Sequence, residues 1–398
     1  MSDTSISKRP LREAFLPFSL PWIGEEEIAE VVEVLRSGWL TTGPKVQRFE
    51  EAFGAAVGAQ HAVGLSSCTA ALHLALAGLG IGPGDEVITT TFTFAATVNV
   101  ILHVGARPVL VDVRTETWTM DPAAVEAAIT PRTAAIIPVH YAGHPCDMSI
   151  LWSLARRHGL AVVEDAAHAL GAALDDLPVG SGESDAVCFS FYPIKNITTG
   201  EGGMLVTPNA DLASRVRQLS LHGISRDAWQ RSEGRGSWYY EVRAPGFKYN
   251  MTDIQAAIGL KQLERMPFLQ NRRKSYAKRY DAELKSLPGI VPQAVVPGVQ
   301  HARHLYPIRI FPSELGFTRD EVIRGLAEAH IGTSVHYIPI HLHPYASKVL
   351  GYQRGDFPVS EAVYEGILSL PLYPKMSDAD VEDVLHALRT IVASRAPT

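Results

Sequence analysis

The chain has 398 residues, of which 46% are hydrophobic and 20% are charged, so it can bury a large core without disulfide bonds. It carries 36 Lys and Arg against 42 Asp and Glu, and the net charge of −6 argues against a protein that binds duplex nucleic acid. The three cysteines are widely spaced, and we find no signal peptide or membrane-spanning segment, so we expect a cytoplasmic protein with no membrane partner.

Two helices are predicted near the start of the chain, after a polar leader at residues 1–15 that we expect to be disordered. The first helix covers residues 25–37 and ends before Gly38, a residue suited to a helix C-cap. Its apolar residues recur at the spacing of one helical face: Ile28, Val31, Val32 and Leu35. The second helix follows Pro44, because proline fits the first position of a helix.

Short apolar runs then alternate with helical patterns. Five runs are predicted to be buried strands, at residues 87–91, 109–113, 134–139, 160–164 and 186–189. Three intervening segments are predicted to be helices, at residues 70–79, 122–129 and 150–158. This alternation predicts an α/β fold with a mostly parallel sheet covered by helices on both faces. Because ligands of such sheets bind beyond the carboxyl ends of the strands, the residues after each strand are the first site candidates.

The last third of the chain is predicted to be a smaller α/β domain. A long charged helix over residues 259–287 leads into it. Its strands are expected at residues 305–311 and 333–337, and its helices at residues 319–330 and 378–394. We therefore predict a large domain at residues 16–270 and a small C-terminal domain at residues 271–398.

Asp165 stands where a predicted buried strand ends, so its carboxylate would face the ligand crevice. A carboxylate there can hold a protonated ring nitrogen through a charge-assisted hydrogen bond. On position alone, an exposed loop carboxylate or a helix N-cap is the simpler interpretation. His168 would share a face with Asp165 if a helix begins here, and otherwise reads as a core histidine.

Lys195 follows another predicted strand, and its neighbours at residues 191–194 (Phe-Tyr-Pro-Ile) are an unusual setting for a surface lysine. Desolvation lowers the pKa of an amine and makes it a usable nucleophile or base. Lysine forms the Schiff base with pyridoxal phosphate (PLP), while an acidic residue pairs with the pyridine nitrogen. Lys195 and Asp165 fit these two roles.

A phosphate group could bind where residues 64–71 (GLSSCTAA) lead into a helix, because backbone N–H groups and hydroxyls gather at such a start. Serine and threonine at a helix start are more often simple caps. Ser190 could add a hydroxyl. Phe92 and Phe94 offer aromatic faces for a planar cofactor, and a core position for at least one of them is the alternative.

Together these segments resemble the DegT-type sugar aminotransferases, PLP enzymes with the aspartate aminotransferase-like fold, fold type I. The resemblance runs from residue 16 to the last predicted helix. It rests on residues 37–44 (SGWLTTGP), 82–88 (GPGDEVI), 138–143 (PVHYAG), 164–168 (EDAAH), 190–195 (SFYPIK), 200–203 (GEGG) and 246–253 (GFKYNMTD). Among subfamilies, the chain is most similar to enzymes that aminate UDP-4-keto sugars, such as the UDP-4-amino-4-deoxy-L-arabinose aminotransferase.

The resemblance implies a role for each residue near the cofactor. Lys195 would bind PLP covalently and carry the proton, Asp165 would pair with the ring nitrogen, and His168 would lie near the phenolic oxygen. Phe94 would stack over the ring. The residues implied around the phosphate are Ser67, Cys68, Thr69 and Ser190.

The resemblance also implies a homodimer with shared active sites, in which Asn250 and Lys248 are the two candidates to reach the partner's phosphate. Many relatives have Asn-x-Arg at these positions, so either residue could make the contact. The residues implied at the substrate are Thr41, Thr42, Tyr192, His336, Tyr337 and His341.

The implied reaction moves an amino group from L-glutamate, which leaves as 2-oxoglutarate, to the keto carbon of a nucleotide-linked sugar in polysaccharide or lipopolysaccharide biosynthesis. A dTDP-linked keto sugar or a cyclitol ketone, as in aminoglycoside pathways, remains an alternative acceptor. Some relatives are dehydratases with histidine in place of Lys195, and the lysine favours amino transfer.

Two alternatives lie outside this class. A metal-dependent hydrolase is suggested by the histidine pairs His301 and His304, and His341 and His343, yet they complete no ligand set, and we expect no metal. A regulator without catalytic activity on the same fold is disfavoured by the intact pair of Asp165 and Lys195.

Overall fold

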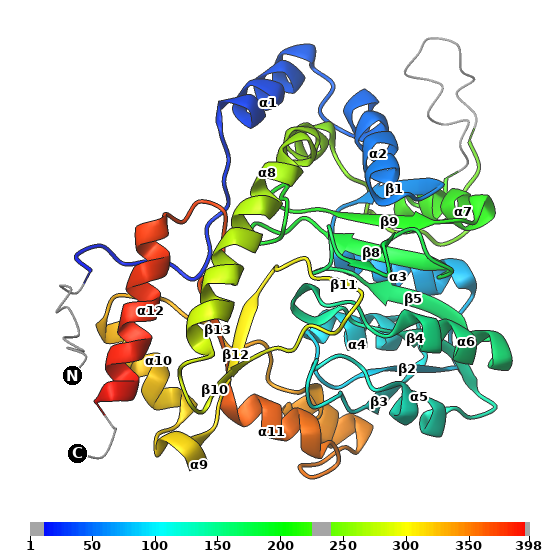
Figure 1. Cartoon of the computed structure of the whole chain (residues 1–398). Coiled ribbons are helices and arrows are strands. Elements are labelled where there is room, and N and C mark those ends of the chain that lie inside the picture. Colours follow the sequence, from blue (N-terminus) through cyan, green and yellow to red (C-terminus); the bar gives the residue numbers. More distant parts are fainter. Residues whose placement is uncertain (1–11, 225–239, 395–398) are drawn as a thin grey trace.

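The computed structural model describes residues 12–224 and 240–394 and centres on a seven-stranded sheet (Figure 1). Its strands lie in the order β1-β9-β8-β5-β4-β2-β3. Their bounds are β1 His61–Leu65, β2 Glu86–Thr90, β3 Arg107–Val111, β4 Thr133–Ile137, β5 Ala161–Asp165, β8 Ala186–Ser190 and β9 Gly203–Thr207. Only β9 runs against its two neighbours, and the other pairs are parallel. The predicted α/β fold with a mostly parallel sheet is confirmed.

Helices cover both faces of this sheet, and the alternation of side chains along each strand explains why. In β4, Ala135 and Ile137 enter the core shared with one layer of helices, whereas Ile136 enters the core on the opposite face. The first layer contains α3 Cys68–Leu79, α4 Ala95–His103 and α7 Ala210–Ser220. The second contains α2 Pro44–Val57, α5 Pro122–Ala128, α6 Met148–His158 and the first half of α8 Asp253–Leu284.

The structure confirms all five predicted strands of the large sheet and the three predicted helices between them, within two residues at most ends. The sequence analysis missed β1, β9, α4 and α7. Of these, α4 matters most, because it directly precedes β3 and its first turn lies beside the end of β5, as the contact of Thr97 with Asp165 shows.

The C-terminal part has its own three-stranded antiparallel sheet, in the order β10-β12-β13. These strands are β10 Ile290–Pro292, β12 Tyr306–Ile310 and β13 Ile367–Leu370, and the helices that pack with them include α10 Arg319–Glu328 and α12 Asp378–Ala393. The remaining elements are η1 Tyr141–Gly143, β6 Ala173–Leu174, β7 Leu177–Pro178, β11 Val299–Gln300, α9 Pro312–Leu315, η4 Ile340–Leu342, η5 Ala346–Leu350 and α11 Pro358–Gly366.

The predicted strand at residues 333–337 is wrong. Only Ser334 makes a bridge, with Ser369 of β13. The following backbone groups bond to loops of the large sheet instead: the His336 carbonyl accepts from the Tyr141 hydroxyl, and Ile340 N–H donates to the Thr91 carbonyl. This segment therefore leaves the small sheet to reach the large one.

Helix α8 belongs to both cores. Leu260 and Leu269 pack against α2 beneath the large sheet, whereas Tyr276, Tyr280 and Leu284 pack in the C-terminal core. The change of core falls near the boundary at residue 270 that we predict, and that domain division stays a prediction.

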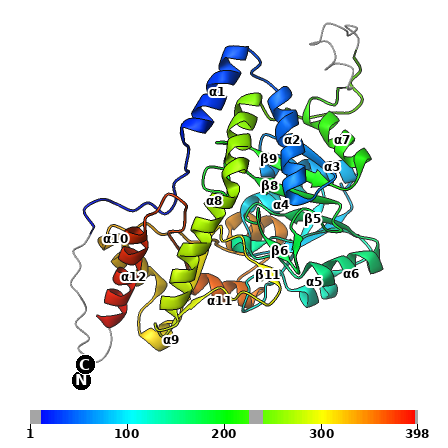
Figure 2. The ribbon, with the colours of Figure 1, turned by 45° about the horizontal axis from the view of Figure 1, so that its top comes forward.

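Helix α1, Glu25–Ser37, is where it was predicted, but its buried face differs. Ile28 and Leu35 of the expected apolar face are 48% and 53% exposed. The helix instead lies along α8 (Figure 2). The carboxylate of buried Glu27 accepts from Gln262 and Arg265 of α8. The hydrogen bonds of Glu27, rather than burial of the predicted apolar face, hold α1 against α8.

Within the described residues, no helix is both long and apolar enough to cross a membrane.

Candidate active site

Asp165 and Lys195 meet at the carboxyl end of the sheet. Asp165 is the last residue of β5 and is 7% exposed, and Lys195 lies in the loop after the adjacent strand β8. Burial lowers the pKa of Lys195 to about 8, although the negative charge of Asp165 and the nearby Cys68 act in the opposite direction. The site thus contains an amine that is partly neutral near pH 8 and a carboxylate that influences it.

His168 is a neutral hydrogen-bond donor toward the same site. Its Nδ1 accepts from the backbone N–H of Ala142 at 3.2 Å, so this nitrogen carries no proton. Burial, with smaller contributions from Lys195 and His336, holds the pKa of His168 well below its usual range. The single ring proton is therefore on Nε2, which lies 3.0 Å from the hydroxyl of Tyr337. Nε2–H therefore donates to the Tyr337 hydroxyl in this structure, and an anionic oxygen could accept it only by taking the place of that hydroxyl.

The start of α3 forms an anion site next to the residues described above. The Ser67 hydroxyl accepts from Ala70 N–H at 3.0 Å, as a normal N-cap. Within the described part of the chain, the N–H groups of Cys68 and Thr69 have no protein acceptor, and they point out of the helix start. A Cβ at Gly203 would lie 2.4 Å from the backbone nitrogen of Cys68, so glycine is required for β9 to pass this close.

Cys68 contributes backbone rather than thiol to this anion site. Its Sγ points inward to the Cys188 carbonyl at 3.4 Å, and burial raises the thiol pKa well above its usual range. Ser190 ends β8 and is partly buried, and its hydroxyl accepts from Tyr192 N–H at 3.4 Å.

The two candidate phenylalanines take opposite positions. Phe92 is fully buried in the core with Tyr141, whereas Phe94 is 62% exposed at the N-cap of α4. The Phe94 ring centroid lies 5.9 Å from that of Tyr337, which places Phe94 over the open site. Tyr192 is also exposed, at 46%.

His336 and Tyr337 come to the site on the segment that leaves the small sheet. Burial, and then the charge of Lys195, lower the pKa of His336 to about 4, so its ring is neutral at physiological pH. Its Nδ1 lies 3.0 Å from the hydroxyl of Ser369. Burial, and then the charge of Asp165, raise the pKa of Tyr337, so its hydroxyl stays protonated.

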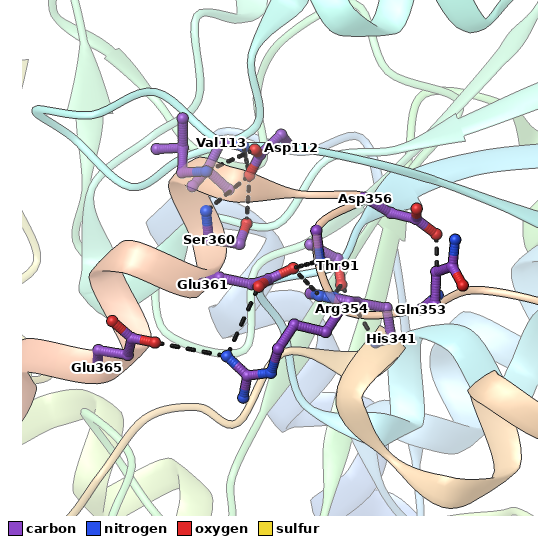
Figure 3. Close-up of polar contacts among 12 residues, drawn as sticks. Thr91, Asp112, Val113, His341, Gln353, Arg354, Asp356, Ser360, Glu361 and Glu365 are labelled. Carbon is purple, nitrogen blue, oxygen red and sulfur yellow. Dashed lines mark hydrogen bonds and ion pairs between the residues drawn. The ribbon is translucent and has the colours of Figure 1, made fainter.

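His341 is enclosed rather than open to a ligand (Figure 3). Its Nδ1 is 2.8 Å from the Thr91 hydroxyl and its Nε2 is 2.9 Å from the carboxylate of Glu361 in α11. The ring has no polar atom left for a sugar, which conflicts with the expected substrate contact. His341 instead ties the C-terminal segment to the loop after β2.

The structure brings Thr42 and Asn250 together at the edge of the molecule. The Asn250 amide donates to the Thr42 hydroxyl at 2.8 Å, and that hydroxyl donates to the Met251 carbonyl. Thr41 precedes them and its carbonyl accepts from Asp253 N–H at 3.0 Å. Lys248 is exposed.

The sequence analysis missed two residues that touch the site. Thr97 donates to Asp165 at 2.8 Å, and the His304 ring packs against His168 with centroids 4.4 Å apart and planes tilted by 39°. Nothing in the spacing of His304 signals this contact. Thr97 lies in a threonine-rich segment after β2, which is a weak signal.

No three His, Cys, Asp or Glu side chains within residues 12–224 and 240–394 gather closely enough to hold a metal ion.

Residues 21–389 match the model of the DegT/DnrJ/EryC1/StrS aminotransferase family. The chain is 53% identical over 382 residues to the spore coat polysaccharide biosynthesis protein SpsC of Bacillus subtilis (strain 168), covering 96% of this chain and 98% of SpsC.

Two solved structures are similar over nearly their whole length. The protein Spr1654 of Streptococcus pneumoniae, assigned as a sugar aminotransferase and solved in its PLP form, is 38% identical with a TM-score of 0.89, covering 96% of this chain and all 100% of Spr1654. PseC of Helicobacter pylori, an aminotransferase involved in pseudoaminic acid biosynthesis, is 30% identical with a TM-score of 0.88, covering 96% and 100%.

Proposed function

This chain belongs to the DegT/DnrJ/EryC1/StrS aminotransferase family, and from that premise we propose that it is a PLP-dependent enzyme that moves an amino group from L-glutamate to the keto carbon of a nucleotide-linked sugar. The observation that carries the proposal is the convergence of Lys195, Asp165 and His168 beside the start of α3.

The residues fit PLP in charge and in hydrogen bonding. The free N–H groups of Cys68 and Thr69 suit its phosphate, and the Asp165 carboxylate suits its ring nitrogen. Nε2–H of His168 would suit its phenolic oxygen in place of the Tyr337 hydroxyl, to which it now donates. Exposed Phe94 suits the face of its ring. When bound, PLP supplies an electron sink for the carbon from which a proton is removed.

Lys195 has two tasks in this proposal. Its amine would hold PLP covalently, which requires a neutral nitrogen, and a pKa of about 8 provides one at mildly alkaline pH. Its Nζ then takes a proton from the substrate carbon and returns it, as a base whose pKa is near the working pH. The Asp165 carboxylate is held in place beside it by Thr97 and Ala167. His168 holds its own proton on Nε2.

The names of the relatives support a sugar acceptor. SpsC is named for spore coat polysaccharide biosynthesis, and PseC for the biosynthesis of pseudoaminic acid. We propose a UDP-linked 4-keto sugar made and consumed in the cytoplasm for polysaccharide or lipopolysaccharide synthesis. A cyclitol ketone would require the same Lys195 chemistry and differs only in the acceptor pocket.

We also propose a homodimer that shares its active sites. The open side of the site presents Phe94 and Tyr192, two large exposed aromatic side chains. Burial of such side chains against a second copy is favourable, and cyclic dimers are the commonest assembly. Lys248 and Asn250 lie near the surface, where either could reach the partner's phosphate.

Purified protein should be yellow with PLP and should aminate a member of a panel of nucleotide-linked keto sugars when L-glutamate is the donor, read by mass spectrometry. Lys195→Ala should abolish transfer, because no other amine replaces its attachment and proton transfer. Lys278→Ala, a change of an exposed lysine on α8, is the matched control and should keep full activity. A fully active Lys195→Ala enzyme would overturn the proposal.

A further inference from the structure

We propose that Thr97 and Thr93 form a hydroxyl relay that orients the Asp165 carboxylate toward the ring nitrogen of the cofactor, with Thr97 as the positioning residue. The inference rests on the proposed function, because it assigns Asp165 to that nitrogen. It concerns Thr97 in the first turn of α4 and Thr93 just before that helix, which the family motifs quoted from the sequence do not include.

The hydroxyl of Thr97 is committed to Asp165 and not to its own helix. Thr97 is fully buried, and its Oγ1 lies 2.8 Å from Oδ2 of Asp165. The N-cap of α4 is Phe94, which makes no side-chain capping bond. The Thr97 hydroxyl is therefore directed across to β5 rather than used to cap its own helix.

The direction of each proton follows from valence. A carboxylate only accepts, so Thr97 must donate its single hydroxyl proton to Asp165. The hydroxyl of Thr93 lies 2.8 Å from that of Thr97 and must then be the donor in this pair. Thr93 is itself 1% exposed, so water does not compete for the bond.

The second oxygen of Asp165 is fixed independently. Oδ1 accepts from the backbone N–H of Ala167 at 3.1 Å. With one donor on each oxygen, the carboxylate plane cannot rotate freely. An ionised carboxylate of fixed orientation is what a protonated ring nitrogen needs as its partner.

The neighbouring threonines bond to other groups. Thr89 is also fully buried, and its hydroxyl donates to the Ile137 carbonyl at 2.8 Å. Thr90 accepts from Phe92 N–H, and Thr91 contacts His341. Thr89 therefore provides a matched control: an equally buried hydroxyl of the same segment, bonded to backbone rather than to Asp165.

The test compares full-length Thr97→Val, Thr97→Ser and Thr89→Val with the parent enzyme. PLP affinity is measured by absorbance titration of the cofactor-free protein, and the pH dependence of the bound cofactor's absorption is recorded with kcat and KM. Loss of a hydrogen bond to a charged group corresponds to about a 10- to 100-fold change in a binding or rate constant. Thr97→Val should therefore weaken PLP binding and lower kcat, each by about this factor. Its pH profile should shift, while KM for the sugar stays near the parent value.

Thr97→Ser keeps the hydroxyl and should stay close to the parent, and Thr89→Val should leave PLP affinity and the pH profile unchanged. Thr93→Val should act in the same direction as Thr97→Val, but less strongly, which keeps the test open if Thr97→Val fails to fold. Equal behaviour of Thr97→Val and Thr89→Val, or an equal loss in Thr97→Ser, would overturn the relay. A parent protein that takes up no PLP would overturn the proposed function instead.

Discussion

The ionisation of Lys195 determines the pH range in which this site can react. Burial favours the neutral amine, and the Asp165 carboxylate favours the ammonium form, with the balance at a pKa of about 8. An ordinary lysine titrates near pH 10.4, so the site makes the amine reactive at a lower pH.

Capture of PLP by the cofactor-free protein should therefore depend on pH. Below the pKa of about 8, the neutral fraction of Lys195 falls about tenfold per pH unit, so the capture rate should rise with pH and level off above that value. Asp165→Asn removes the charge that stabilises the ammonium form and should move the midpoint to lower pH. Stopped-flow absorbance checks both curves, and a midpoint near pH 10 in the parent would contradict the burial of the amine.

At this scale, the sequence predicted the residues whose positions follow from the strands. Asp165 and Lys195 end up together because they follow adjacent parallel strands, β5 and β8. The contact of Thr97 could not be predicted, because it depends on how α4 docks against the sheet and α4 itself was missed. His341 shows the reverse: its segment resembles one that relatives use at the substrate, but the fold shows that both of its ring nitrogens are engaged within the protein.

Among the elements, α2 depends on a carboxylate from another helix. Asp253, the first residue of α8, accepts from the N–H groups of Gly43, Lys45 and Val46 at the start of α2, at 2.8, 3.1 and 3.0 Å. A negative charge at a helix N-terminus also interacts favourably with the helix dipole. One buried side chain thus joins two helices and holds the loop that carries Thr41 and Thr42.

Asp253→Ala should destabilise the fold by about 2–4 kcal/mol, because it leaves three buried or partly buried N–H groups without an acceptor. The matched control is Asp121→Ala, which removes an N-cap of α5 with a single bond to Ala123 N–H and should cost about 1 kcal/mol. Urea denaturation followed by circular dichroism measures both. Equal losses in the two variants would mean that the link between α8 and α2 adds nothing to an ordinary cap.

Two expectations about elements, the strand at residues 333–337 and the buried face of α1, failed for the same physical reason. The segment 333–337 has the apolar character of a strand, yet its backbone bonds to loops of the large sheet. The apolar face of α1 has the correct period, yet the helix is fixed through Glu27. In both cases the periodicity was correct, and tertiary contacts distant in sequence decided the outcome.

For the whole molecule, the central question is whether two chains share each active site. If they do, an inactive Lys195→Ala chain and an inactive chain with both Lys248→Ala and Asn250→Ala should complement each other. Random reassociation of equal amounts gives about half mixed dimers, each with one intact site, so about a quarter of the parent activity should return. The assay is amino transfer after joint refolding, with Lys195→Ala refolded alone as the control. A mixture that stays inactive while mixed dimers form would show that each site lies within one chain.

The packing of the C-terminal segment on β3 also bears on how the protein avoids aggregation. β3 is at the edge of the seven-stranded sheet. The backbone groups of its odd-numbered residues bond to β2 and to the loops that flank β2, so the backbone groups of its even-numbered residues face outward. Of the outward positions, residue 108 is a proline without an N–H group, and the N–H of Leu110 donates to the Tyr352 hydroxyl at 3.0 Å. A strand from another molecule would therefore find no free N–H donor on β3. The segment that links α11 to the sheet thus also protects an edge that could otherwise pair with strands of other molecules.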